Sequence, residues 1–265
     1  MLTYKTTSEA YLETLRDIYT NPEFKSSPRG QPIYETTDYT FRVLEPDSSP
    51  IKTKDSERNA VIESYTRKEI DLYNSCTNLA EDFGKASKFW LSLANPDKTV
   101  NSAYGYLIWK NASHGSKFEI EYEEVTYNHD YKGPGVVLFP KIKMRTPWEY
   151  AKQCLLNDKD TRQAIVRFSL PEHSWIGNRD QVCTLHGNFL IRDDKLHLSV
   201  VMRSNDLVLG LVYDLPWFCS LMDRMVEELK PYYPDLVKGH YTHTVHSLHI
   251  YEKNEEMVKK MLGVI

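Results

Sequence analysis

A single cysteine and a carboxylate bound the stretch of this chain that is best suited to covalent chemistry. Cys183 opens the segment CTLHGNFLIRDDKLHLSVVMRSNDLVLGLVYD, and Asp214 closes it. A cysteine thiolate attacks electrophilic carbon, and a neighbouring cation such as Arg203 favours the thiolate form. His186, three residues beyond the cysteine, is a candidate base if the strand directs it to the same side. A small buried hydrophobe is the alternative role for a free cysteine, and residue type alone leaves both open.

The polar cluster between the two apolar runs and the next helix matches the chemistry of a phosphate monoester. Arg203 and Ser204 offer a planar cation and a hydroxyl, which together suit phosphate oxygens. The alternative is a turn at the hairpin exit, in which Asp206 accepts local backbone N–H groups. Asp214 likewise fits either a pocket carboxylate or the N-cap of a helix at 215–229.

Four histidines spaced three apart near the end of the chain invite a zinc interpretation, because that spacing lines one helix face. They are His240, His243, His246 and His249. The segment 241–251 is rich in Thr, Val, Ile and Tyr, so it predicts a strand, in which successive side chains point to opposite faces. Alternation then separates the four rings into two pairs, and no metal site is predicted.

Helices and strands alternate along the chain and must bring these residues together. Helices are predicted at 8–19, 55–75, 80–94, 147–156, 215–229 and 252–263, and strands at 33–44, 117–126, 136–139, 164–168 and 241–251, with a hairpin turning at Asp193-Asp194. Ser8 is the candidate N-cap of the first helix, and Thr146 begins a capping box. The segment 101–109 reads as a loop. Glu69 lies on the second helix, where a solvated surface acid is the simplest role. One α/β domain over 1–265 accounts for this order.

Composition restricts the classes of partner. The 265 residues carry a net charge of −4, which gives no general attraction to nucleic acid or to an anionic membrane, so phosphate recognition requires a few placed arginines. Four cysteines without a CxxC pair indicate reduced thiols and a cytoplasmic location. No apolar stretch approaches the ~20 residues that span a bilayer.

The order of these motifs resembles the thymidylate synthase superfamily. The order comprises the cysteine, the hairpin, RSNDLVLG at 203–210, Asp214 and HIY at 249–251. The phage deoxycytidylate hydroxymethylases are the most similar branch, through "CT", "FLIRDDK", "MRSND" and "SLHIY". The resemblance extends over 60–110 and 145–255, and 111–145 looks like an insertion. It implies an α/β (α+β) fold with a mixed sheet, flanking helices and one sheet face packed at a homodimer interface, and it favours a viral source.

The resemblance assigns the nucleotide phosphate to a set of arginines. Arg203 and Ser204 match phosphate ligands, and Arg29 in SPRG matches an arginine of an N-terminal loop. Arg162 in DTRQ matches one of two arginines that the family supplies across the dimer interface. Gln163 stands at the second of these positions, which weakens or replaces that part of the clamp.

The resemblance also assigns the residues around the ring and the sugar. Cys183 matches the nucleophile that adds to pyrimidine C6, and Tyr104 matches the tyrosine that helps remove the C5 proton. Glu69 matches the glutamate that organises water and proton transfer. His249 and Tyr251 match the residues that hold the sugar 3′-hydroxyl.

The cosubstrate implied is 5,10-methylenetetrahydrofolate, with Trp90, Asp206 and Glu69 at its site. Asp214 departs from the asparagine that thymidylate synthases carry. An asparagine amide donates to uracil O4, whereas a carboxylate accepts from the N4 amino group of cytosine and from a protonated N3. Asp214 therefore favours cytosine over uracil, and Ser204 and the phage-like pattern favour the deoxynucleotide, so the expected substrate is dCMP.

Three activities remain open at this point. Water held near Glu69 would give 5-hydroxymethyl-dCMP, and this outcome is favoured by the closer resemblance. Hydride transfer from the folate would give 5-methyl-dCMP instead. A catalytically impaired nucleotide-binding homologue is the third alternative, because Gln163 departs from the pattern and only fourteen residues follow Tyr251.

Overall fold

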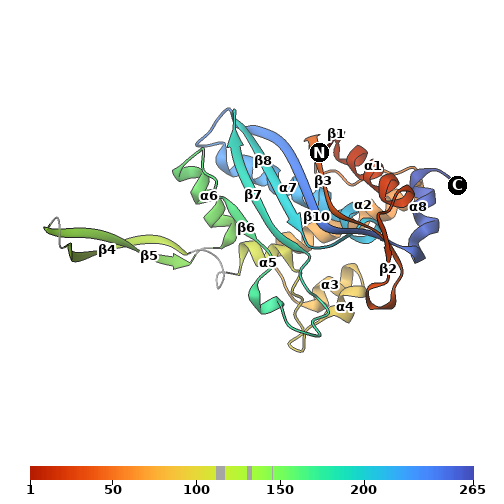
Figure 1. The fold of residues 1–265 in the computed structure, drawn as a ribbon, viewed down its shortest axis with the longest axis horizontal. Coiled ribbons are helices and arrows are strands. Elements are labelled where there is room, and N and C mark those ends of the chain that lie inside the picture. The colour runs from red at the N-terminus through yellow and green to blue at the C-terminus, as the bar shows by residue number, and fades with distance from the viewer. Residues whose placement is uncertain (112–116, 130–132, 145) are drawn as a thin grey trace.

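A mixed eight-stranded sheet lies at the centre of the chain (Figure 1). The computed structural model describes residues 1–111, 117–129, 133–144 and 146–265. The strands of the central sheet are β1 (Leu2–Thr6), β2 (Phe24–Ser26), β3 (Ile33–Glu45), β6 (Ile165–Arg167), β7 (Thr184–Arg192), β8 (Lys195–Met202), β9 (Asn205–Asp206) and β10 (Val237–Tyr251). The main order is β1-β3-β10-β8-β7-β6, with β2 paired to β3 and β9 to β10. The sheet is mixed, because β10 is antiparallel to β3 and parallel to β8.

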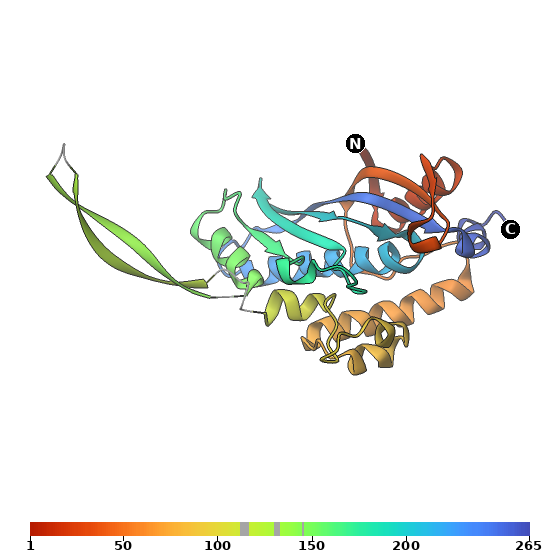
Figure 2. The same ribbon diagram turned by 60° about the horizontal axis from the view of Figure 1, so that its bottom comes forward.

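Eight α-helices are assigned over the described residues. They are α1 (Thr7–Thr20), α2 (Ser56–Ser75), α3 (Ala80–Ala86), α4 (Phe89–Leu93), α5 (Tyr104–Trp109), α6 (Pro147–Asn157), α7 (Val212–Leu229) and α8 (Glu255–Leu262). The long apolar helix α7 packs on β8 and β10, and α2 packs against α7 from the outside (Figure 2). Twelve side chains of α7 are buried, among them Trp217 and Phe218. This arrangement is the mixed sheet with flanking helices that the sequence predicts.

The opposite face of the sheet carries a row of polar residues in register across four strands. Arg42 pairs with Thr242, Thr242 with Ser199, and Ser199 with Asn188. All four are only half-buried. Within the described part of the chain, a buried side-chain atom of Arg42, Thr242 and Asn188 has no hydrogen-bond partner. Such atoms are uncommon in folded proteins, and this face is therefore suited to packing against another surface.

A long hairpin extends away from the body of the molecule (Figure 1). Its strands β4 (Lys117–His129) and β5 (Gly133–Met144) pair antiparallel as a separate two-stranded sheet. Both strands predicted in this region fall inside them. Elsewhere, no helix among the described residues is long and apolar enough to cross a membrane.

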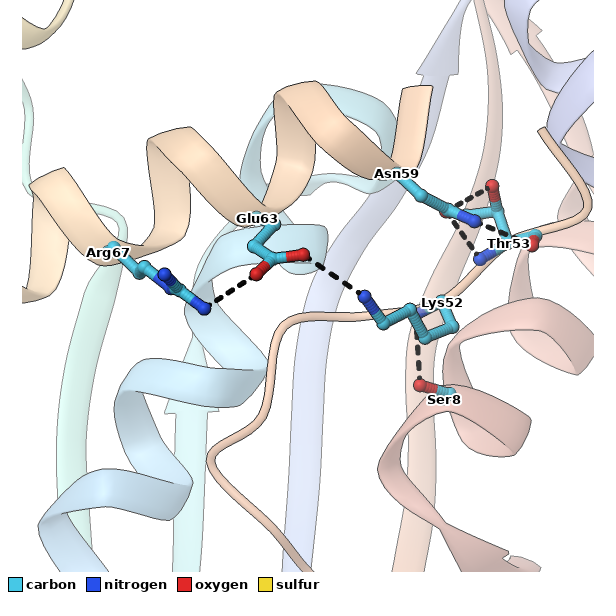
Figure 3. A network of polar contacts seen from close by, with 6 residues as sticks. All are labelled: Ser8, Lys52, Thr53, Asn59, Glu63 and Arg67. Atoms are coloured by element: carbon cyan, nitrogen blue, oxygen red, sulfur yellow. Dashed lines mark hydrogen bonds and ion pairs between the residues drawn. The ribbon is translucent and has the colours of Figure 1, made fainter. Parts of the chain in front are cut away.

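Helix α2 is held at its N-terminal half by a network of polar contacts (Figure 3). Asp55 caps the helix by accepting from the Arg58 N–H. Glu63 binds Lys52 at 3.3 Å and Arg67 at 2.6 Å. The backbone N–H of Lys52 donates to Ser8 Oγ at 3.0 Å, so α1 and α2 are tied together.

Four local predictions made from the sequence were wrong. Ser8 is not the N-cap of α1, because Thr6 takes that position in a capping box with Glu9. The helix predicted at 80–94 is broken into α3 and α4. The segment predicted as a loop at 101–109 contains the helix α5. Asp214 is not an N-cap, since α7 begins at Val212.

Candidate active site

Cys183 lies at the start of β7 and is surrounded by its own loop and by Arg203. The Arg203 guanidinium donates to the carbonyls of Val182 at 3.1 Å and Gln181 at 2.5 Å, and one of its nitrogens lies 3.5 Å from the cysteine Sγ. Burial raises the pKa of the thiol, whereas the charges of Arg203 and Arg29 oppose that shift. The arginine therefore both shapes the cysteine loop and favours the thiolate.

His186 is not a hydrogen-bond partner of the cysteine. The described contacts of the Cys183 Sγ are the Gln181 carbonyl and Arg203. His186 instead lies across from Arg167 in the β6–β7 pair. Burial and the Arg167 charge lower the pKa of this imidazole. The structure thus gives no support to His186 as the base.

Asp214 is a half-buried carboxylate with a defined donor. The Asn205 Nδ2 amide donates to Asp214 Oδ2 at 2.9 Å, and Asn205 is itself only 3% exposed. Burial raises the pKa of Asp214 to about 6, against the effect of this hydrogen bond. A π-helical turn, Leu207–Leu211, precedes α7, so Asp214 lies inside the first helical turn. No described residue forms a hydrogen bond with its second oxygen, which is therefore open to a ligand.

Glu69 is buried on α2 and faces the same region as Asp214. The Tyr65 hydroxyl donates to Glu69 Oε1 at 3.2 Å, and Trp90 Nε1 donates to the Tyr65 oxygen at 3.0 Å. Burial first, and then the charge of Asp214, raise the pKa of Glu69 to about 8. A carboxyl with such a pKa can carry a proton near neutral pH and release it. The surface-acid role is excluded, because Glu69 is only 8% exposed.

Tyr104 lies behind the cysteine, at the start of α5. Its hydroxyl accepts from Thr184 Oγ1 at 2.9 Å, and its ring stacks on Tyr73 at 5.3 Å. Gly105 permits this approach, because a Cβ there would lie 1.7 Å from the Tyr73 carbonyl oxygen. Burial raises the pKa of Tyr104, and the charges of Asp214 and Cys183 act in the same direction. Tyr104 and Cys183 are therefore close enough to influence each other electrostatically.

The strand β10 brings two further predicted residues to this end of the sheet. His249 pairs with Asp206 through the short parallel β9–β10 contact, and its ring packs edge-on against Tyr251 at 5.2 Å. Burial raises the pKa of Asp206, opposed by His249 and Lys253. One Asp206 oxygen also accepts from the Val208 N–H at 2.8 Å, so the local turn role foreseen for it is present.

The histidines of β10 divide as strand alternation predicts. His243 and His249 are buried at 0% and 8% exposure, whereas His240 is half-buried and His246 exposed on the other face. Burial lowers the pKa of His243 to about 3, which keeps this ring neutral. The four rings therefore do not converge.

A cavity of about 620 Å³ opens next to the cysteine loop and is rich in cations. Its lining includes Arg29, Arg179, Arg203 and Gln181. Ser204 follows Arg203 and is half-buried, and Arg162 is exposed on a turn that does not line the cavity. The structure thus groups Arg29 with Arg203 and leaves Arg162 outside.

Sequence reasoning missed several residues of the site. Tyr65 and Tyr73 lie four residues before and after Glu69, a spacing that places side chains on one helix face. That spacing could have identified both tyrosines as neighbours of Glu69. For Asn205 the sequence offers no signal beyond its position beside Asp206. Arg179 and Gln181 precede Cys183 by four and two residues in a loop without a recognisable motif.

Known proteins share both the sequence pattern and the fold. The family model for thymidylate synthase matches residues 9–263. The deoxycytidylate 5-hydroxymethyltransferase of Enterobacteria phage T6 is 26% identical over 202 residues, which cover 75% of this chain and 71% of the phage protein. The deoxyuridylate hydroxymethyltransferase of Bacillus phage SP01 is 28% identical over 196 residues, covering 71% and 49%.

A solved structure gives the same result for the fold. Thermostable thymidylate synthase A from Bacillus subtilis superposes with a TM-score of 0.65 at 19% identity, covering 96% of this chain and 83% of that one. Together with the match of nearly the whole sequence to one family model, this shows that the chain belongs to the thymidylate synthase family of one-carbon transferases.

Proposed function

We propose that this enzyme transfers a one-carbon unit from 5,10-methylenetetrahydrofolate to C5 of dCMP and forms 5-hydroxymethyl-dCMP. The observation that carries the proposal is the half-buried carboxyl of Asp214, held on one oxygen by Asn205 at 2.9 Å. The free oxygen can accept from a cytosine amino group, which a uracil lacks. The T6 relative, named for deoxycytidylate hydroxymethylation, supports the same substrate class.

The cytosine edge and the Asp214 carboxyl together hold one proton. Both oxygens can meet this edge, because the oxygen that accepts from Asn205 keeps a second lone pair. A neutral carboxyl then donates to N3 of neutral cytosine and accepts from N4, and a carboxylate accepts from both when N3 is protonated. Because the pKa of Asp214 is raised to about 6, this proton is available at modest cost near neutral pH. Protonated N3 draws electrons from the ring, and addition at C6 then becomes easier.

Asn205 has a consequence for the choice of base. Its Nδ2 group donates to residue 214, so the side-chain atom of residue 214 that faces Asn205 must be a hydrogen-bond acceptor. A carboxylate satisfies it with either oxygen. An asparagine at 214 would turn its oxygen towards Asn205 and its amino group towards the base. That orientation donates to O4 of uracil and meets the amino group of cytosine with a second donor.

Cys183 supplies the covalent step. Its thiolate adds to C6 and leaves C5 electron-rich, and C5 then bonds to the one-carbon unit. Tyr104 lies within electrostatic range of the thiol, and we assign it to removal of the C5 proton. Loss of that proton and of tetrahydrofolate leaves an exocyclic methylene on the ring.

Glu69 governs the last step of the proposal. Its hydrogen bond to Tyr65 and its raised pKa of about 8 let it hold a water molecule and exchange a proton with it. Addition of that water to the methylene, followed by release of the cysteine, gives the hydroxymethyl group. Delivery of hydride instead of water would give 5-methyl-dCMP.

Trp90 and Asp206 are the residues proposed to hold the folate. Trp90 is tied to Glu69 through Tyr65, and Asp206 presents a half-buried carboxylate suited to the N–H groups of a pterin. We assign these residues to the cosubstrate, which supplies the one-carbon unit at the oxidation level of formaldehyde. The sugar 3′-hydroxyl is assigned to His249 and Tyr251, and the phosphate to Arg29, Arg203 and Ser204.

A homodimer completes the proposal. The open sheet face carries buried polar atoms of Arg42, Thr242 and Asn188 that lack partners within the described residues. Packing of a second copy on this face would satisfy them, and it would allow Arg162 of one chain to reach the phosphate site of the other. Light scattering with size-exclusion chromatography measures the oligomeric state directly. A monomer at the concentration used for activity assays would contradict the proposed homodimer.

The product mass tests the function. Wild-type enzyme is incubated with dCMP and methylenetetrahydrofolate, and the nucleotide is weighed, with Cys183→Ser as the matched control. A cysteine-dependent gain of CH₂O supports the proposal, and a gain of CH₂ identifies a methyltransferase instead. Unchanged dCMP with both proteins would indicate an impaired homologue.

A further inference from the structure

Three arginines from separate parts of the chain meet in the cavity beside the cysteine loop. Arg29 comes from the turn Pro28–Gly30, Arg203 follows β8, and Arg179 precedes Cys183 by four residues. We propose that Arg179 is a third anion-binding residue of this chain, and that it contacts the nucleotide phosphate together with the other two. The identity of the anion rests on the proposed function, whereas the binding role of Arg179 rests on the cavity itself.

The charge of the cavity indicates an anionic ligand. Its other lining residues are Ser92, Leu93, Gly177, Asn178 and Gln181. None of the lining residues is an aspartate or glutamate, so three arginines line one space without a carboxylate among them. Like charges at close range repel, and a doubly charged phosphate monoester would relieve that repulsion. Guanidinium groups are well suited to its oxygens.

The two neighbours of Arg179 fix its loop to the protein body. Asn178 Nδ2 donates to the His173 carbonyl at 2.6 Å. On the other side, the Asp180 carboxylate accepts from the backbone N–H of Ser102 at 2.9 Å and from its hydroxyl at 2.5 Å. Arg179 itself is exposed. The loop therefore presents this side chain at the cavity from an anchored backbone, which reduces the entropy lost on binding.

Arg203 cannot devote all its donors to a ligand. Its Nε and one terminal nitrogen are engaged by the carbonyls of Val182 and Gln181, so part of its hydrogen-bonding capacity serves the cysteine loop. Gln163 meanwhile stands where the family pattern has a second cross-subunit arginine. An additional cation from the same chain would compensate for the positive charge that Gln163 lacks.

Titration of full-length protein with three probes tests the inference. Binding of dCMP, deoxycytidine and inorganic phosphate is compared for wild type, Arg179→Ala and Arg179→Lys. The matched control is Arg16→Ala, an exposed arginine on α1 paired with Glu13. We expect Arg179→Ala to weaken dCMP binding about tenfold, as for loss of one charge-assisted hydrogen bond. Phosphate binding should weaken in parallel, deoxycytidine binding should not change, and lysine should restore part of the loss.

The outcomes separate the two proposals. If wild type converts dCMP while Arg179→Ala binds dCMP and phosphate as tightly as wild type, the inference is wrong and the function stands. An equal loss for deoxycytidine would also overturn it, because the effect would then not lie at the phosphate. If phosphate binding depends on Arg179 but dCMP is not converted, the inference stands and the proposed function fails. Absence of both dCMP and phosphate binding in wild type would overturn both.

Discussion

The amide of Asn205, which is buried, donates to one oxygen of the half-buried Asp214 at 2.9 Å. This bond fixes the carboxyl plane and leaves the other oxygen for a base. It also holds the pKa of Asp214 lower than burial alone would set it. Recognition of the base therefore depends on a pair of residues and not on the carboxylate alone.

Replacing Asp214 by asparagine should change the preferred base. The proposed orientation of the new amide leaves the cytosine edge mismatched, at a cost of about 1–3 kcal/mol per unpaired group. We expect kcat/KM for dCMP to fall by about tenfold to a hundredfold, and turnover of dUMP to rise. Steady-state kinetics with both nucleotides measure this change. Asp223→Asn, on the exposed side of α7, is the control, and an unchanged dCMP to dUMP ratio in Asp214→Asn would contradict the account.

Removing the Asn205 donor should move the pH dependence of dCMP binding. In Asn205→Leu the pKa of Asp214 rises above its value of about 6, because the hydrogen bond that lowers it is lost. The carboxyl and cytosine share one proton, so dCMP affinity should fall as pH rises through this pKa. The midpoint should lie at higher pH in the variant. Calorimetric binding in a Cys183→Ser background avoids titration of the thiol, and identical midpoints with and without Asn205 would refute this role.

Glu69 should make the protein less stable as the pH rises. Its folded-state pKa of about 8 lies above the ordinary value of 4.5, so the folded state binds more protons than the unfolded state between these values. The free energy of unfolding contributed by this group therefore falls as pH increases through that window. Glu69→Gln removes the titration, and its stability relative to wild type should grow from about pH 4.5 and level off above about pH 8.

Denaturant unfolding at several pH values measures the effect of Glu69. The matched control is Glu63→Gln, which changes a carboxylate on the exposed side of the same helix (Figure 3). A stability difference between wild type and Glu69→Gln that stays constant with pH would show that the Glu69 carboxyl does not titrate in this range.

Cys183→Ser should abolish turnover while binding of dCMP persists. A serine hydroxyl at this position lacks the nucleophilicity of a thiolate, and the loss of a catalytic nucleophile costs roughly a thousandfold or more in kcat. Release of label from C5 of dCMP measures the step directly. Turnover within tenfold of wild type would place the covalent bond elsewhere.

The sequence predicted the elements whose signals are local. Helix α2 was predicted at 55–75 and spans Ser56–Ser75 after the Asp55 cap. The β7–β8 hairpin follows from Asp193 and Asp194, which adopt positive φ angles of 50° and 55°. The capping box at Thr146 and Glu149 likewise marked the start of α6. The fold class could be predicted from the order of helices and strands together with the order of the sequence motifs.

The remaining features depend on tertiary contacts that have no local signal. Helix α5 was missed because it is short, and its Gly105 is required by the approach of the Tyr73 carbonyl. The start of α7 was misplaced because a π-helical turn precedes it. The Asn205–Asp214 bond joins residues nine apart across that turn. Arg179 enters the cavity because of anchors at Ser102 and His173, which a sequence pattern does not reveal.

A structure of the complex with dCMP tests the central claim most directly. The account predicts the cytosine amino group within hydrogen-bond distance of the Asp214 oxygen that Asn205 does not occupy, and C6 facing the Cys183 sulfur. A base bound away from that sulfur, or an Asp214 carboxyl that makes no contact with the base, would contradict it.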